Sequence, residues 1–206
     1  MIVYVESNFV LELALEQEQY ESCRKIISIC ESDKARLVIP AFCIAEPYET
    51  LGRRSGERTA LKTSLANALK LLSRSKSYQQ ELNELRSVTD ILNRSIEDEQ
   101  QRLHQTFERI LKIAEIIPLE QKILTAAAKF QSDFGLKPPD AIVYASVIYH
   151  LKADGNVDKC FLNRNSKDFD DPDIESDLLG YRCKMLFRFD TGYEYIQNQS
   201  SRGITR

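Results

Sequence analysis

The first nine residues, Met1-Ile-Val-Tyr-Val-Glu-Ser-Asn-Phe9, constrain the fold more than any other stretch of the chain. The uninterrupted apolar run that ends at Val5 is typical of a strand buried on both faces of a parallel sheet. Glu6 ends this run, and Ser7 or Asn8 offers an N-cap to a helix predicted over residues 9–15. Because chemistry in open α/β sheets gathers beyond the carboxyl ends of the strands, Glu6 is the first candidate functional residue.

Much of the remaining chain alternates between short apolar runs and amphipathic segments. Further strands are predicted at residues 36–40, 116–119, 159–162 and 183–187, and further helices at residues 20–30, 41–51, 120–134 and 141–152. This alternation predicts an α/β fold with a doubly wound parallel sheet. The helix over residues 41–51 carries Glu46 and is expected to end at Gly52, whereas Asp140 follows two prolines that favour a helix start.

Residues 53–113 interrupt the alternation and predict a separate helical arm. Residues 53–76 hold seven basic residues and one acidic residue, and leucines at helical spacing give this segment one apolar face. Residues 77–115 are mixed in charge, with apolar residues near heptad spacing. We therefore expect an inserted hairpin of two long helices, with residues 1–52 and 114–198 forming the α/β domain.

Composition excludes several classes of protein. The net charge of −3 excludes a uniformly basic nucleic-acid binder but allows a local basic patch. No apolar run is long enough for a membrane span, and the chain begins with a strand rather than a secretory leader. Five cysteines without a C-x-x-C pair, and only two histidines, argue against structural zinc and favour reduced thiols. We therefore expect a cytoplasmic protein that does not bind membranes.

Four stretches of the chain stand out by their order and by the strand or helix context of each. They are Val3-Tyr-Val-Glu-Ser-Asn8, Ile39-Pro-Ala-Phe-Cys-Ile-Ala-Glu46, Leu136-Lys-Pro-Pro-Asp-Ala-Ile-Val-Tyr-Ala145 and Phe161-Leu-Asn-Arg-Asn-Ser-Lys-Asp-Phe169. Together they resemble the PIN-domain nucleases, a family that includes VapC-type toxins and RNA-processing endonucleases. The resemblance covers roughly residues 1–52 and 114–190 but not the arm.

The resemblance implies metal-dependent cleavage of RNA by a cluster of acidic residues. Mg²⁺ or Mn²⁺ is the implied cofactor, since hard cations take carboxylate oxygens and can keep crowded carboxylates ionised. Such ions orient a water, lower its pKa and neutralise charge that develops on a phosphodiester. By position, the implied catalytic and metal-binding residues are Glu6, Glu46 and Asp140, with the fourth place falling on Asn165 or Asp168.

Other roles for these residues remain open. Ser7 and Asn8 are either helix caps or substrate contacts, and Arg164 either contacts a phosphate or braces the acidic loop that follows. Asp140 can serve simply as a helix-start residue, and Asp168 can belong to a solvated acidic loop over residues 168–177. Glu46 can be an ordinary charge on a helix surface.

Two departures from the family pattern motivate a rival hypothesis. Glu6 stands where the family usually has Asp, and Asn165 is a neutral amide. The rival is a PIN-like module that has lost efficient chemistry and binds RNA or protein. Under either hypothesis the arm is expected to touch RNA, a partner protein or a second copy of the chain in a homodimer. A toxin-like role with a neutralising partner is also open.

Overall fold

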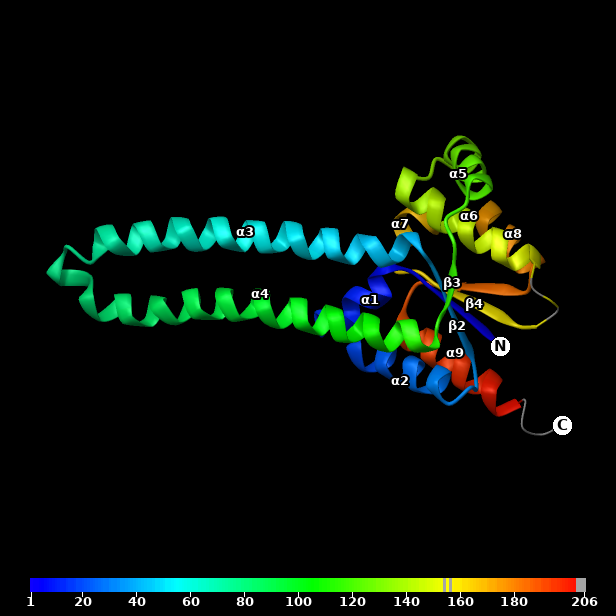
Figure 1. Ribbon diagram of the computed structural model, residues 1–206, viewed down its shortest axis with the longest axis horizontal. Helices are drawn as coiled ribbons and strands as arrows, with labels where there is room; N and C mark the ends of the chain where they lie inside the picture. The colour runs from blue at the N-terminus through cyan, green and yellow to red at the C-terminus, as the bar shows by residue number, and fades with distance from the viewer. Residues whose placement is uncertain (154, 156, 203–206) are drawn as a thin grey trace.

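A single parallel sheet forms the centre of the computed structural model, which describes residues 1–153, 155 and 157–202, without the side chains of residues 78–86 and 200–202 (Figure 1). The strand order is β3-β2-β1-β4-β5, and all four pairings are parallel. This confirms the doubly wound α/β class, with the order reversing between β1 and β4. The strands are β1 (Ile2–Val5), β2 (Arg36–Pro40), β3 (Glu115–Ile117), β4 (Lys159–Leu162) and β5 (Cys183–Leu186).

Helices cover both faces of the sheet, which explains why β1 and β4 are buried along their whole length (Figure 1). One face carries α1 (Ser7–Ala14), α2 (Tyr20–Glu31) and α9 (Phe189–Arg202). The other face carries α5 (Gln121–Phe134), α6 (Pro138–Ala153), α7 (Ser166–Phe169) and α8 (Pro172–Gly180). No helix in the described part of the chain is both long and apolar enough to cross a membrane.

The arm is a helical hairpin that projects far from the sheet, as predicted (Figure 1). It consists of α3 (Phe42–Leu72) and α4 (Gln79–Ile113), joined through the short 3₁₀ helix η1 (Lys76–Tyr78). The expected helix end at Gly52 is wrong, because α3 continues through Gly52 and Gly56. Glycine costs a helix only about 1 kcal/mol relative to alanine, and packing against α4 outweighs that local cost.

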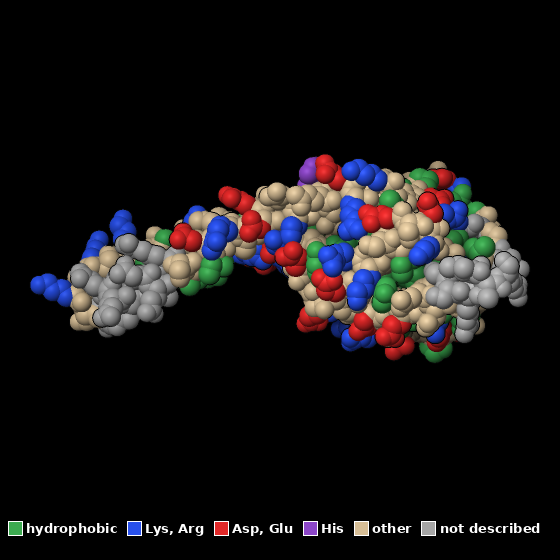
Figure 2. All heavy atoms as spheres, turned by 90° about the horizontal axis from the view of Figure 1, so that it is seen from below, with side chains coloured by type: hydrophobic (Ala, Val, Ile, Leu, Met, Phe, Trp, Pro, Cys, Tyr) green, Lys and Arg blue, Asp and Glu red, His purple; other side chains and the backbone are tan. Residues whose placement is uncertain are grey.

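The two ends of the arm differ in environment. At its base, Leu103 and Phe107 of α4 are buried in the core, and α4 packs against α1. Further out, Arg58 of α3 forms an ion pair with Glu99 of α4 at 2.7 Å, so part of the basic excess of α3 is neutralised within the hairpin. Hydrophobic side chains gather along one edge of the arm (Figure 2). Exposed apolar residues in the outer part of the arm include Leu61, Leu71, Leu72, Val88 and Ile91.

The C-terminal part of the chain contains more helix than the sequence predicts. The acidic run over residues 168–177 lies mostly in α7 and α8, rather than in a loop. No helix is predicted after residue 187, yet α9 begins at Phe189 and packs against α2. Phe189 and Ile196, seven residues apart on one face of α9, are fully buried, so packing against the core stabilises this helix.

Candidate acidic site at the carboxyl edge of the sheet

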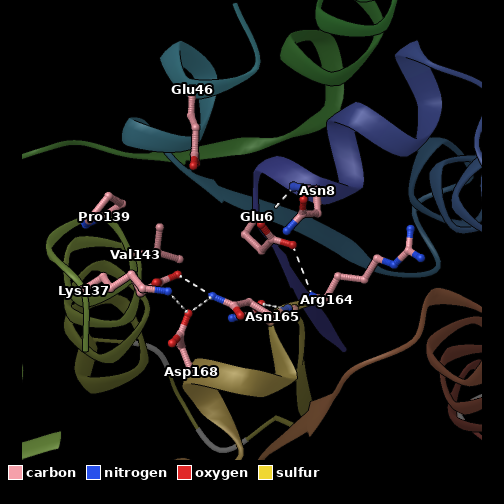
Figure 3. A pocket seen from close by; sticks show the side chains of 11 residues that line it. Glu6, Asn8, Glu46, Lys137, Pro139, Val143, Arg164, Asn165 and Asp168 are labelled. Carbon is pink, nitrogen blue, oxygen red and sulfur yellow. Dashed lines mark hydrogen bonds and ion pairs between the residues drawn. The ribbon is translucent and has the colours of Figure 1, made fainter. Parts of the chain in front are cut away.

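A cavity of about 480 Å³ opens beside the carboxyl ends of β1 and β4, where the strand order reverses (Figure 3). Segments far apart in the sequence contribute to its walls: the start of α1, the second turn of α3, the first turn of α6 and the loop after β4. The cavity is lined by all five residues expected to bind metal, Glu6, Glu46, Asp140, Asn165 and Asp168. Asn8 and Arg164 also line it, whereas Ser7 does not.

Glu6 directly follows β1 and is the N-cap of α1. Its Oε2 atom accepts the backbone N–H of Asn8 at 2.9 Å, so the cap expected from Ser7 or Asn8 is supplied by Glu6 instead. A carboxylate can fill this position because it accepts an orphan helix N–H and is favoured by the helix dipole. The Oε1 atom of Glu6 accepts the backbone N–H of Arg164 at 3.3 Å.

The environment of Glu6 perturbs its ionisation. Only 7% of the residue is exposed. Burial raises the pKa of Glu6 to about 7, although the N–H groups of Asn8 and Arg164 act in the opposite direction. The nearby charge of Glu46 adds a smaller upward contribution to the pKa. A carboxyl group poised near neutrality in a cavity is a marker of functional sites.

Glu46 lines the cavity from α3, a different element from the β1–α1 junction that carries Glu6. Its side chain points from α3 into the hollow (Figure 3). The hydroxyl of Ser7, which is itself buried, donates a hydrogen bond to Oε2 of Glu46. Ser7 therefore orients a cavity carboxylate, a contact that replaces the helix cap expected for it.

The remaining two acidic residues, Asp140 and Asp168, are bridged by one amide side chain at the cavity wall formed by α6 and α7. Asp140 lies in the first turn of α6, and burial raises its pKa. The side-chain amide of Asn165 donates to Oδ1 of Asp140 at 3.1 Å and to Oδ2 of Asp168 at 2.8 Å. Lys137 forms an ion pair with Asp168 at 2.8 Å and lowers the pKa of that carboxyl (Figure 3). Asp168 thus faces the cavity instead of the solvent around an acidic loop.

Sequence reasoning missed two residues of this site, Lys137 and Asn163. Lys137 belongs to the motif that precedes Asp140, and its side chain is 64% exposed at the cavity. Asn163 is buried, and its Oδ1 accepts the backbone N–H of Asn165 at 2.8 Å, which shapes the loop after β4. The guanidinium of Arg164 runs away from Asn165 and Asp168 (Figure 3), a direction that favours its bracing role.

The oxygen atoms that line the cavity are of the type that binds a hard divalent cation. Carboxylate and amide oxygens are the ligands that Mg²⁺ and Mn²⁺ prefer. Among the described residues, however, no group of three or more histidine, cysteine, aspartate or glutamate side chains is close enough to hold a metal ion. The contacts that fix the carboxylates come from the chain itself. Ser7 holds Glu46, Asn165 bridges Asp140 and Asp168, and Lys137 pairs with Asp168.

Comparison with models of protein families agrees with the fold. The family model for the PIN domain matches residues 3–169. A comparison with curated protein sequences gives no match. Among solved structures, one chain from the crystal structure of VapBC2 from Rickettsia felis, bound to a DNA fragment from their promoter, aligns with 12% sequence identity and a TM-score of 0.45. That alignment covers 90% of this chain and 99% of the other.

Proposed function

Because the chain belongs to the PIN-domain family, we propose that it is a metal-dependent endoribonuclease that hydrolyses RNA phosphodiesters in the cavity beside β1 and β4. One observation carries the proposal: acidic side chains from separate segments line a single cavity at the carboxyl edge of the sheet. These residues are Glu6, Glu46, Asp140 and Asp168. Such an edge, at the point where the strand order reverses, is where open α/β sheets place their ligands.

The proposed cofactor is Mg²⁺ or Mn²⁺, held by Glu6, Glu46 and Asp140, with Asn165 or Asp168 as a further ligand. When bound, such an ion supplies a water of lowered pKa and neutralises charge on the phosphodiester. The chain's own groups orient the carboxylates: the Ser7 hydroxyl holds Glu46, and the Asn8 and Arg164 N–H groups hold Glu6. These contacts restrict side-chain rotation, which a site with near-octahedral ligand geometry requires.

Lys137 is the proposed contact for a substrate phosphate. Its ammonium group is exposed beside the acidic residues, and an exposed ion pair such as that with Asp168 is worth only about 0–1 kcal/mol. Lys137 can therefore exchange Asp168 for a phosphate oxygen at small cost. Asn8 lines the same cavity and is a second candidate contact, whereas the guanidinium of Arg164 already pairs with acidic residues elsewhere.

RNA cleavage in the presence of Mg²⁺ or Mn²⁺ tests the proposal directly. We expect the wild type to cut single-stranded RNA, and Glu6→Gln and Asp140→Asn each to lower the rate by roughly 100-fold, since each removes an ionised ligand. The matched control is Glu175→Gln, an exposed acidic residue of α8 outside the cavity, which should cut at the wild-type rate. Unchanged rates in both cavity variants would reject this site, and matched DNA of the same sequence tests the preference for RNA.

A catalytically degenerate binding module is the second candidate function. It is favoured by the amide of Asn165, which donates to Asp140 and Asp168 and so satisfies two carboxylates without a cation. Calorimetric titration with Mn²⁺ separates the two functions. A saturable heat at micromolar to millimolar metal supports the nuclease, whereas RNA binding without saturable metal binding supports the module.

We also propose a cellular location for the protein and a role for its arm. A reducing, cytoplasmic compartment is supported by the five cysteines, all buried and free. The arm is proposed as a protein-contact surface, supported by the exposed Leu61 and Ile91. A track for the RNA backbone is less well supported there, because Arg53 and Arg58 are already paired with Glu57 and Glu99.

A further inference from the structure

Glu12 is a buried carboxylate that the proposed chemistry does not use. It lies on α1, beyond the cavity, and has 0% of its surface exposed. Its Oε2 atom accepts the backbone N–H of Gln19 at 2.8 Å, and its Oε1 atom forms an ion pair with the guanidinium of Arg164. Burying a carboxylate is costly unless the charge is paired, so the position of Glu12 and that of Arg164 are strongly linked.

Arg164 connects this buried pair to the cavity. Its guanidinium pairs with Glu12, while its backbone N–H donates to Oε1 of Glu6. Figure 3 shows the two ends of the residue facing in different directions, the backbone toward Glu6 and the side chain away from Asn165. The ion pair therefore ties the start of the loop after β4 to α1, across the point where the strand order reverses.

We propose that Glu12 is a positioning residue of the acidic site. Through Arg164 it holds the loop after β4 where the Arg164 N–H meets Glu6 and where the next residue, Asn165, bridges Asp140 and Asp168. The inference rests on the proposed nuclease function. Glu18, the other acidic partner of Arg164, cannot supply the same constraint because its side chain is 85% exposed and solvent screens the pair.

Gln19 provides a control variant that separates loss of fold stability from loss of positioning. Gln19, whose N–H donates to Glu12, uses its own Oε1 atom to accept the N–H groups of Phe189 at 2.6 Å and Asp190 at 3.2 Å. Its side chain therefore caps the start of α9, away from the cavity. Gln19→Ala should weaken the fold while leaving the Glu12–Arg164 pair, and hence the loop, in place.

A double-mutant cycle on RNA cleavage tests the inference. We expect Glu12→Gln and Arg164→Met each to lower kcat by about 10- to 100-fold with KM for RNA within about threefold of the wild type, as for residues that orient metal ligands. The double variant should be no slower than either single variant, because both act through one contact. Glu18→Gln should match the wild type, and Gln19→Ala should lower Tm but not kcat. Additive losses, or losses of kcat that follow Tm across all variants, would overturn the inference.

Amide hydrogen exchange gives a readout that does not depend on activity. The N–H of Arg164 should exchange faster in Glu12→Gln than in the wild type, and at the wild-type rate in Glu18→Gln. If the wild type does not cleave RNA but exchange responds in this way, the proposed function fails and the positioning role stands. If RNA is cleaved but exchange is unchanged, the positioning role fails. Should Glu12→Gln not fold, the double variant, which buries no unpaired charge, supplies the same exchange measurement.

Discussion

Replacing Glu6 with glutamine should flatten the dependence of folding stability on pH. Burial raises the pKa of this carboxyl from 4.5 to about 7, so the folded protein holds the proton more tightly than the unfolded chain. Between these two pKa values the folded state binds more protons, and the free energy of unfolding therefore falls as pH rises. The contribution of Glu6 is fully present below about pH 4.5 and is lost once pH passes about 7.

The magnitude follows from the size of the pKa shift. A rise from 4.5 to about 7 corresponds to roughly 3 kcal/mol of stability lost across this range, at about 1.4 kcal/mol per pKa unit. That is a large share of the 5–15 kcal/mol typical of a folded domain. Glutamine keeps the length of the side chain and one acceptor oxygen for the N–H of Asn8 or Arg164, but it does not titrate.

Urea unfolding followed by circular dichroism, in the presence of a metal chelator, measures this effect. The difference in unfolding free energy between Glu6→Gln and the wild type should shift by about 3 kcal/mol in favour of the variant from pH 4.5 to pH 7.5. The exposed Glu18→Gln serves as the control and should follow the wild type. A difference that stays constant over this range would refute the reasoning. Added Mn²⁺ should oppose the effect at pH 7.5, because a bound cation favours the ionised wild-type carboxylate.

Two further predictions concern the phosphate contact and the core. Lys137→Met should weaken RNA binding and lower the slope of log Kd against log salt concentration by about one, as expected for one lost phosphate contact. Lys167→Met, in α7 and outside the cavity lining, should change neither quantity. Gly192→Ala should destabilise the fold by roughly 1–3 kcal/mol in urea unfolding, because the new Cβ would lie 2.7 Å from Cδ2 of the fully buried Leu162. Gly180→Ala, where a Cβ meets nothing within 4 Å, is the matched control.

The parts of the fold that the sequence predicted are those that local pattern determines. The apolar run over Ile2–Val5 has the composition of a doubly buried strand, and the structure buries all four residues. The helix predicted over residues 120–134 is α5, and Gly135, directly after it, adopts the left-handed conformation that ends the helix. Gly52 carries the same local signal, yet α3 passes through it. The difference is the packing of α3 on α4, a contact that no window of sequence around Gly52 contains.

In the site, too, local pattern predicts some features, whereas contacts between distant segments determine the others. The rule that strand ends collect functional groups predicts Glu6, and the family resemblance adds Asn165 and Asp168 after β4. All three residues line one cavity. The partners of these groups depend on residues far away in the chain: Ser7 reaches Glu46, and Glu12 reaches Arg164 across about 150 residues of sequence. Neither contact leaves a motif, so the role of Glu12 becomes visible only once the two segments are seen together.

The two departures from the family pattern are compatible with metal binding on stereochemical grounds. Glu6 uses one interaction on each carboxylate oxygen, to the N–H groups of Asn8 and Arg164, and a carboxylate offers about four acceptor sites. Capacity therefore remains for a cation while the helix stays capped. Asn165 donates through its NH₂ group, and its side-chain oxygen can serve as a ligand without breaking those bonds.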